Sequence, residues 1–101
     1  MNPTKKEILF HQLIWDYNIS GSDIEAVFSG TKKHAGHYTR PMLFKKMLES
    51  YSWFTILEVF TKEEIEEMLT DNVVNSLRMP SLRKQYEFVQ KRLQEIISIA
   101  G

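Results

Sequence analysis

The most constraining feature of the sequence is a regular apolar repeat near its C-terminal end. Five large apolar residues recur at steps of four, three, four and three: Leu82, Tyr86, Val89, Leu93 and Ile96. A helix with 3.6 residues per turn places residues at these steps along one side, which is the seam of a packed or coiled helix. We therefore predict a long helix over about residues 81–98. Phe88, Ile97 and Ile99 lie off this seam, and apolar residues beyond one stripe are typical of a helix that meets a second partner.

Shorter amphipathic segments precede this helix, and most of them follow a Ser, Thr or Asp that can cap a helix. Three pairs have the spacing of a capping box, in which the hydroxyl and the acid each bind a free main-chain amide: Thr4 with Glu7, Ser22 with Glu25, and Thr61 with Glu64. The predicted helices are residues 5–14, residues 22–29, one capped by Thr39, one capped by Ser52, residues 62–69 and residues 71–77.

Two segments are less regular. Residues 13–19 alternate apolar and polar side chains, so an extended stretch competes with helix there.

The second of these segments follows Gly30. This glycine ends the second helix, because glycine tolerates the left-handed conformation common at a helix C-terminus. We predict a polar, basic loop over residues 31–38.

The length and composition indicate one all-α domain. A chain of 101 residues is the size of a single domain, so we predict that residues 1–101 form one compact bundle of six to seven helices. The chain has no cysteine, which excludes a disulfide framework and a thiolate metal site. The first residues do not have the pattern of a secretion signal, so we expect none, and no segment approaches the roughly 20 apolar residues of a membrane span. We expect a cytoplasmic protein without membrane contact.

Charge is balanced overall but segregated along the chain. The formal net charge is zero, which argues against strong nonspecific binding to nucleic acid. Residues 61–71 are strongly acidic, whereas residues 32–46 and 78–92 are basic. This distribution is typical of a dipolar molecule that docks through charged surfaces.

The candidate chemical motifs are weak, and we predict no catalytic, cofactor or metal site. His34 and His37 are three residues apart, but Gly36 and the adjacent lysines indicate a loop, and no third metal ligand is evident. The glutamates of residues 63–67 lie in the first turns of a helix, where the helix dipole favours acids. Both groups are better explained as surface residues than as a reactive site.

The residues that we expect to contact a partner fall into three groups. A tryptophan beside an acid can anchor an interface, basic residues can form a docking patch, and off-seam apolar residues can be covered by a second chain. These residues are Trp15 and Asp16; Lys32, Lys33, Arg40, Arg78 and Arg83; and Phe88 and Ile97.

A DNA-binding regulator is the alternative hypothesis. Residues 61–69, a brief turn and residues 71–77 have the lengths of a helix-turn-helix. A recognition helix needs side chains that reach base edges, and the second segment offers Asn72, Asn75, Ser76 and Arg78. The first segment is acidic and would repel phosphate, so we expect DNA contact less than protein contact.

Several short motifs resemble a known group of proteins. Residues 13–18 read LIWDYN, residues 39–49 read TRPMLFKKMLE, Trp53 follows, and residues 77–78 and 81–88 read LR and SLRKQYEF. In these motifs the chain resembles small, uncharacterised prokaryotic helical proteins that are often encoded beside abortive-infection-type (AbiEii-like) nucleotidyltransferase toxins.

The resemblance covers residues 13–92 and implies a role but no catalytic residues. It implies an antitoxin-like protein that binds a nucleotidyltransferase-type toxin. We therefore expect a non-enzymatic protein–protein interaction module, with a homodimer through the C-terminal helix as a second arrangement. A helix-turn-helix-like transcriptional regulator remains the alternative.

Overall fold

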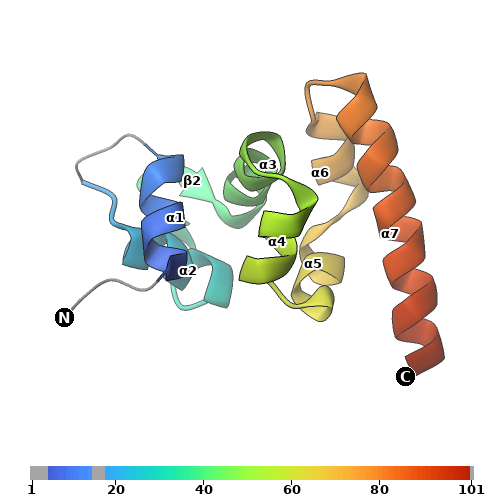
Figure 1. Cartoon of the computed structure of the whole chain (residues 1–101). Coiled ribbons are helices and arrows are strands. Elements are labelled where there is room, and N and C mark those ends of the chain that lie inside the picture. The colour runs from blue at the N-terminus through green and yellow to red at the C-terminus, as the bar shows by residue number, and fades with distance from the viewer. Residues whose placement is uncertain (1–4, 15–17, 101) are drawn as a thin grey trace. The chain divides into compact units, whose positions relative to one another are not determined.

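Seven helices make up most of the described chain (Figure 1). The computed structural model describes residues 5–14 and 18–100. The elements are α1 (Lys5–Leu13), α2 (Gly21–Ser29), β1 (His34–Ala35), β2 (Tyr38–Thr39), α3 (Arg40–Ser50), α4 (Trp53–Val59), α5 (Lys62–Met68), α6 (Asp71–Ser76) and α7 (Pro80–Ala100). The prediction of a helical fold with six to seven helices and a long last helix is confirmed. Within the same residues, no helix is both long and apolar enough to cross a membrane.

The chain divides into two units, residues 1–50 and residues 51–101. We call them the N-terminal unit and the C-terminal unit and describe each by itself. The prediction of one domain over residues 1–101 stays a prediction.

In the N-terminal unit, α1 and α2 pack closely against each other. The contact depends on Gly21, the first residue of α2, because a Cβ atom there would overlap the main-chain carbonyl of Glu7 in α1. The rings of Phe10 and Phe28 meet within this contact, with centroids 5.1 Å apart. The buried apolar residues of the unit are Phe10, Ile14, Ile19, Ile24, Val27, Phe28, Ala35, Leu43, Phe44, Met47 and Leu48.

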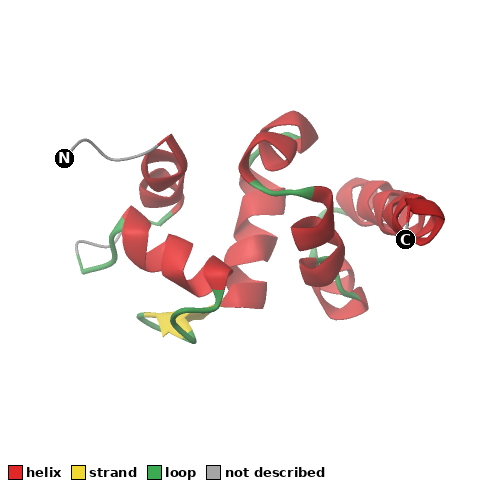
Figure 2. Cartoon of the chain, turned by 90° about the horizontal axis from the view of Figure 1, so that it is seen from below, coloured by secondary structure: helices red, strands yellow, loops and turns green. Residues whose placement is uncertain are grey.

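The predicted loop after α2 contains a small β-hairpin, so the loop prediction was partly wrong (Figure 2). Gly30 does end α2, with a φ of 88°. The strands then pair antiparallel, with Ala35 opposite Tyr38, across a turn in which Gly36 has a φ of 59°. A glycine with positive φ at the first central position is typical of a type II′ hairpin turn. Strands of two residues leave no alternating pattern, which is why periodicity did not predict them.

The doubtful segment of residues 13–19 is only partly described. Leu13 is the last residue of α1, and Ile14 and Ile19 are buried outside any helix. Trp15, Asp16 and Tyr17 lie outside the described residues, so the choice between helix and extended chain stays open for them.

In the C-terminal unit, three short helices begin at Ser or Thr caps, of which Ser52 and Thr61 were predicted. The hydroxyl oxygens of Ser52, Thr61 and Thr70 accept from main-chain amides at the starts of α4, α5 and α6. Thr61 and Glu64 form the predicted capping box, with N···O distances of 2.9 and 3.1 Å. The buried apolar residues of this unit are Ile56, Val59, Phe60, Ile65, Met68, Leu69, Val73, Val74, Leu77, Tyr86 and Leu93.

The long helix α7 covers α5 and α6, and Figure 1 shows both short helices on the same side of it. Pro80 is the first residue of α7, where its missing amide costs no hydrogen bond. The predicted seam is correct for Tyr86 and Leu93, which are buried, but Ile96 is 40% exposed and Ile97 is half-buried instead. We call the buried and half-buried residues on one side of α7 its inner side: Leu82, Arg83, Tyr86, Val89, Gln90, Leu93 and Ile97.

Two glycine substitutions should separate crowding from backbone conformation in the N-terminal unit. Gly21→Ala forces a methyl group into the main chain of α1, which cannot move aside, and should lower the free energy of unfolding by about 3 kcal/mol. Gly30→Ala meets no atom and suffers only the positive φ, so it should cost about 1 kcal/mol. Urea denaturation followed by circular dichroism measures both, and equal losses would contradict the close packing of α1 on α2.

Candidate interaction surface

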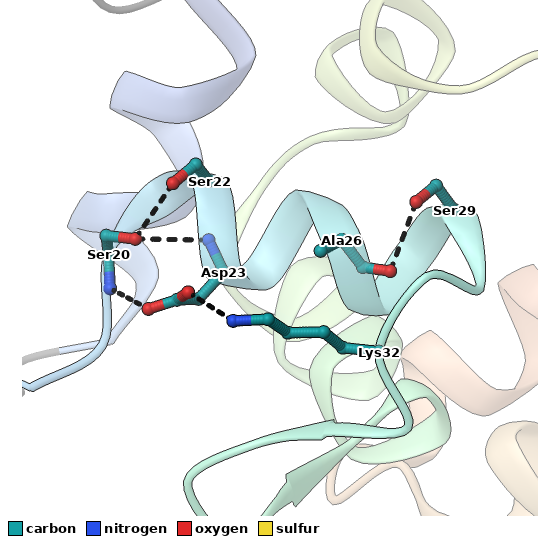
Figure 3. A network of polar contacts seen from close by, with 6 residues as sticks. All are labelled: Ser20, Ser22, Asp23, Ala26, Ser29 and Lys32. Carbon is teal, nitrogen blue, oxygen red and sulfur yellow. Dashed lines mark hydrogen bonds and ion pairs between the residues drawn. The ribbon is translucent and has the colours of Figure 1, made fainter.

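Lys32, one of the predicted contact residues, takes part in a polar network at the start of α2 (Figure 3). Its Nζ lies 2.7 Å from Oδ1 of Asp23. The other oxygen of Asp23 accepts from the amide of Ser20 at 3.0 Å, and Ser20 Oγ accepts from the amide of Asp23 at 3.1 Å. The capping box of α2 is therefore Ser20 with Asp23, and the predicted box of Ser22 with Glu25 was wrong.

This network lowers the pKa of the Asp23 carboxyl group. The hydrogen bond from Lys32, together with that from the amide of Ser20, lowers the pKa of Asp23 from 3.8 to about 2. The carboxylate thus stays ionised and keeps both the cap and the lysine in place over a wide pH range. Lys32 remains about half-exposed, but its charge is already matched within the unit.

The other predicted basic residues of the N-terminal unit lie next to the hairpin. Lys33 is exposed beside β1, and Arg40 is half-buried at the start of α3. His37 stacks on Tyr38, with ring centroids 4.1 Å apart, and Lys46 of α3 places its Nζ 5.7 Å from the centroid of the same tyrosine ring. The hairpin is thereby joined to α3 by a basic and aromatic cluster.

In the C-terminal unit, polar side chains fix the inner side of α7 to the ends of the shorter helices. Gln90 Nε2 donates to the carbonyl of Leu69 at 2.9 Å and to Oδ1 of Asp71 at 3.0 Å, at the junction of α5 and α6. Arg83 Nη1 donates to the carbonyl of Leu77 at 2.8 Å, just after α6. These bonds satisfy carbonyls that a helix end leaves without a helical partner.

Arg83 has a structural role within its own unit, and its predicted contact with a partner stays a prediction. It is half-buried and bound within its own unit, so it positions α7. Arg78 is exposed in the loop before α7, and Ile97 is half-buried on the inner side. The predicted patch of Lys32, Lys33, Arg40, Arg78 and Arg83 includes residues of both units, and that it forms one surface stays a prediction.

The opposite side of α7 carries an exposed aromatic residue among basic ones. Phe88 is 66% exposed, as its off-seam position predicted. Lys84 lies four residues before it and Lys91 three residues after it, so all three share one stripe of the helix. Arg92, which pairs with Glu95 at 3.1 Å, extends this side. We call Lys84, Phe88, Lys91 and Arg92 the outer face of α7.

Other exposed apolar residues were not singled out from the sequence. Phe54 is 78% exposed and Leu57 38% exposed, three residues apart on α4, and Met79 is 58% exposed before α7. The helix α4 has only seven residues, and buried Ile56 and Val59 alternate in it with exposed apolar residues. The apolar spacing therefore did not show which side of α4 would be exposed. Trp53 on the same helix is half-buried, and its ring meets that of Tyr86 edge-on at 6.1 Å.

The pair α5 and α6 has a shorter connection than a helix-turn-helix. Only Leu69 and Thr70 separate the two helices, whereas the motif uses a turn of about three or four residues. On α6, Asp71 binds Gln90 and Ser76 Oγ donates to its own helix, at Val73. Asn72 and Asn75 are thus the exposed amides available to read a base edge.

Within residues 5–14 and 18–100, no three His, Asp or Glu side chains converge as metal ligands. His34 and His37 are both exposed on the hairpin. In comparisons with known proteins, no family model, no curated protein and no solved structure matches the chain.

Acidification should reveal the network around Asp23. Because its pKa is lower in the folded chain than in the unfolded one, its stabilising effect is complete above about pH 4 and is lost as the pH falls through 2. Lys32→Met removes the largest cause of the shift, so the pKa of Asp23 should rise towards 3.8, whereas Lys33→Met should leave it low. Carboxyl carbon NMR titration measures both, and an unchanged pKa in Lys32→Met would contradict the pairing.

Arg83 and Lys84 offer a test of the two sides of α7 at adjacent positions. Arg83→Ala removes the bond to Leu77 and the packing of a half-buried stem, so it should lower the free energy of unfolding by about 1–2 kcal/mol. Lys84→Ala removes an exposed side chain and should change it by less than about 0.5 kcal/mol. Urea denaturation of both variants gives the comparison, and equal effects would show that Arg83 is not an anchor.

Proposed function

We propose that this chain is a non-enzymatic protein–protein interaction module whose outer face of α7 binds the partner. The observation that carries the proposal is the exposure of Phe88, 66%, on a helix whose opposite side is firmly packed. Aromatic residues dominate the binding energy of interfaces when a partner buries them. Lys84 and Lys91 on either side would supply a charged rim.

The resemblance in residues 13–92 supports a particular kind of partner. Proteins with those motifs are often encoded beside nucleotidyltransferase-type toxins, so we propose an antitoxin-like role towards such an enzyme. An inhibitor of this kind covers a site or holds an inactive conformation, and neither mode needs a catalytic group of its own. Residues 81–88, which carry part of the resemblance, lie within α7.

The DNA-binding alternative has less support. The connection between α5 and α6 is short, and the exposed residues of α5 include Glu63, Glu66 and Glu67, which would repel phosphate. A mobility-shift titration with the DNA upstream of the gene, at two salt concentrations, separates the alternatives. Binding through phosphates must weaken steeply as salt rises.

Co-expression with the neighbouring gene product tests the proposal. The tagged full-length chain should retain a nucleotidyltransferase-type neighbour through affinity purification and size exclusion. Phe88→Ser should weaken that complex by about tenfold or more, because it removes the central anchor. Its matched control is Phe54→Ser, which removes a similarly exposed aromatic residue from α4 and should leave the complex intact.

Two results would contradict this function. One is a chain that binds neither the neighbouring product nor itself. The other is a complex that Phe54→Ser disrupts and Phe88→Ser does not, which would place the contact on α4.

A further inference from the structure

The outer face of α7 places an apolar side chain between two lysines. Lys84, Phe88 and Lys91 occupy steps of four and three residues, so they form a straight stripe of two turns, about 10 Å long. All three are exposed. The stripe thus presents one large apolar side chain between two positive charges.

The arrangement disfavours a second copy of the chain as the occupant. In an antiparallel pair of α7 helices centred on Phe88, Lys84 of one copy would face Arg92 of the other, because each lies four residues from the centre. In a parallel pair, each lysine would face its own counterpart. Both orientations bring like charges together, which is unfavourable across an interface.

Glutamate on the same helix disfavours a nucleic acid. Glu95 lies four residues after Lys91, close to the same stripe, and Glu87 is exposed beside Phe88. A continuous phosphate backbone that follows the lysines would pass these carboxylates. A short protein segment whose two acids meet only Lys84 and Lys91 would not have to pass these carboxylates.

From this complementarity we propose that the outer face of α7 binds an acidic amphipathic helix of another protein. The helix would carry a large apolar residue with a Glu or Asp three or four residues to either side. The apolar residue would cover Phe88, and the two acids would meet Lys84 and Lys91. This inference rests on the proposed interaction function and adds the chemistry of the partner.

The probes are two designed helical peptides and one oligonucleotide. The first peptide has a central Leu with a Glu three or four residues to either side. The second peptide has Lys in place of those Glu residues. The third probe is a single-stranded oligo-dT. Each is labelled and titrated with the full chain by fluorescence anisotropy. The acidic peptide should bind, and the Lys peptide should bind at least about tenfold more weakly.

Variants of the chain test which residues are responsible. Phe88→Ser, and the double variant Lys84→Glu with Lys91→Glu, should each weaken the acidic peptide by about tenfold or more. The double variant should also gain affinity for the Lys peptide, a reversal that misfolding cannot produce. Phe54→Ser and Lys62→Glu change an exposed aromatic and an exposed lysine on other helices and should leave binding unchanged.

Three results would overturn the inference. They are equal or absent binding of the two peptides, tighter Phe88-dependent binding of oligo-dT, and a wild-type dimer that Phe88→Ser converts to a monomer. Failure here is distinct from failure of the proposed function. If the neighbouring gene product depends on Phe88 but tolerates the double charge reversal, the partner is not acidic and the interaction function stands.

Discussion

The short helices α4, α5 and α6 depend on the inner side of α7 for their stability. They contain seven, seven and six residues, and isolated helices shorter than about 12–15 residues are marginal in water. Tyr86 and Leu93 of α7 are buried within the C-terminal unit, and Gln90 and Arg83 bind main-chain carbonyls where α5 and α6 end. The inner side of α7 is therefore fully used in holding the unit together.

This use of one side leaves the other side of α7 exposed, and we propose that the exposed side binds a partner. The helix α7 has 21 residues, and the short helices α5 and α6 cover only one side of it. The outer face therefore stays exposed. On this face the chain places Phe88 between Lys84 and Lys91. Exposed single apolar residues are common, but the ordered stripe of charge around this one is what supports a docking role.

Much of this arrangement could be predicted because it depends on the spacing of residues that are close together in the sequence. Steps of four and three predicted α7 and left Phe88 off the seam, and Thr61 with Glu64 predicted the start of α5. Contacts that depend on tertiary structure left no such signal: Arg83 binds a main-chain carbonyl, and Gly21 is required only because α1 crosses it closely. Competing local patterns explain two errors. Ser22 with Glu25 has the same spacing as the true box of Ser20 with Asp23, and the helical repeat drifts from a strict seam, so that Ile97 replaces Ile96.

A substitution scan along α7 with two readouts tests the separation of its sides most directly. Free energy of unfolding and retention of the co-expressed partner are measured for each variant of the full chain. The account predicts that Tyr86 and Leu93 variants lose stability, while Lys84, Phe88 and Lys91 variants lose only partner retention. It would be contradicted if variants of the outer face lost as much stability as those of the inner side, since that face would then be packed rather than open to a partner.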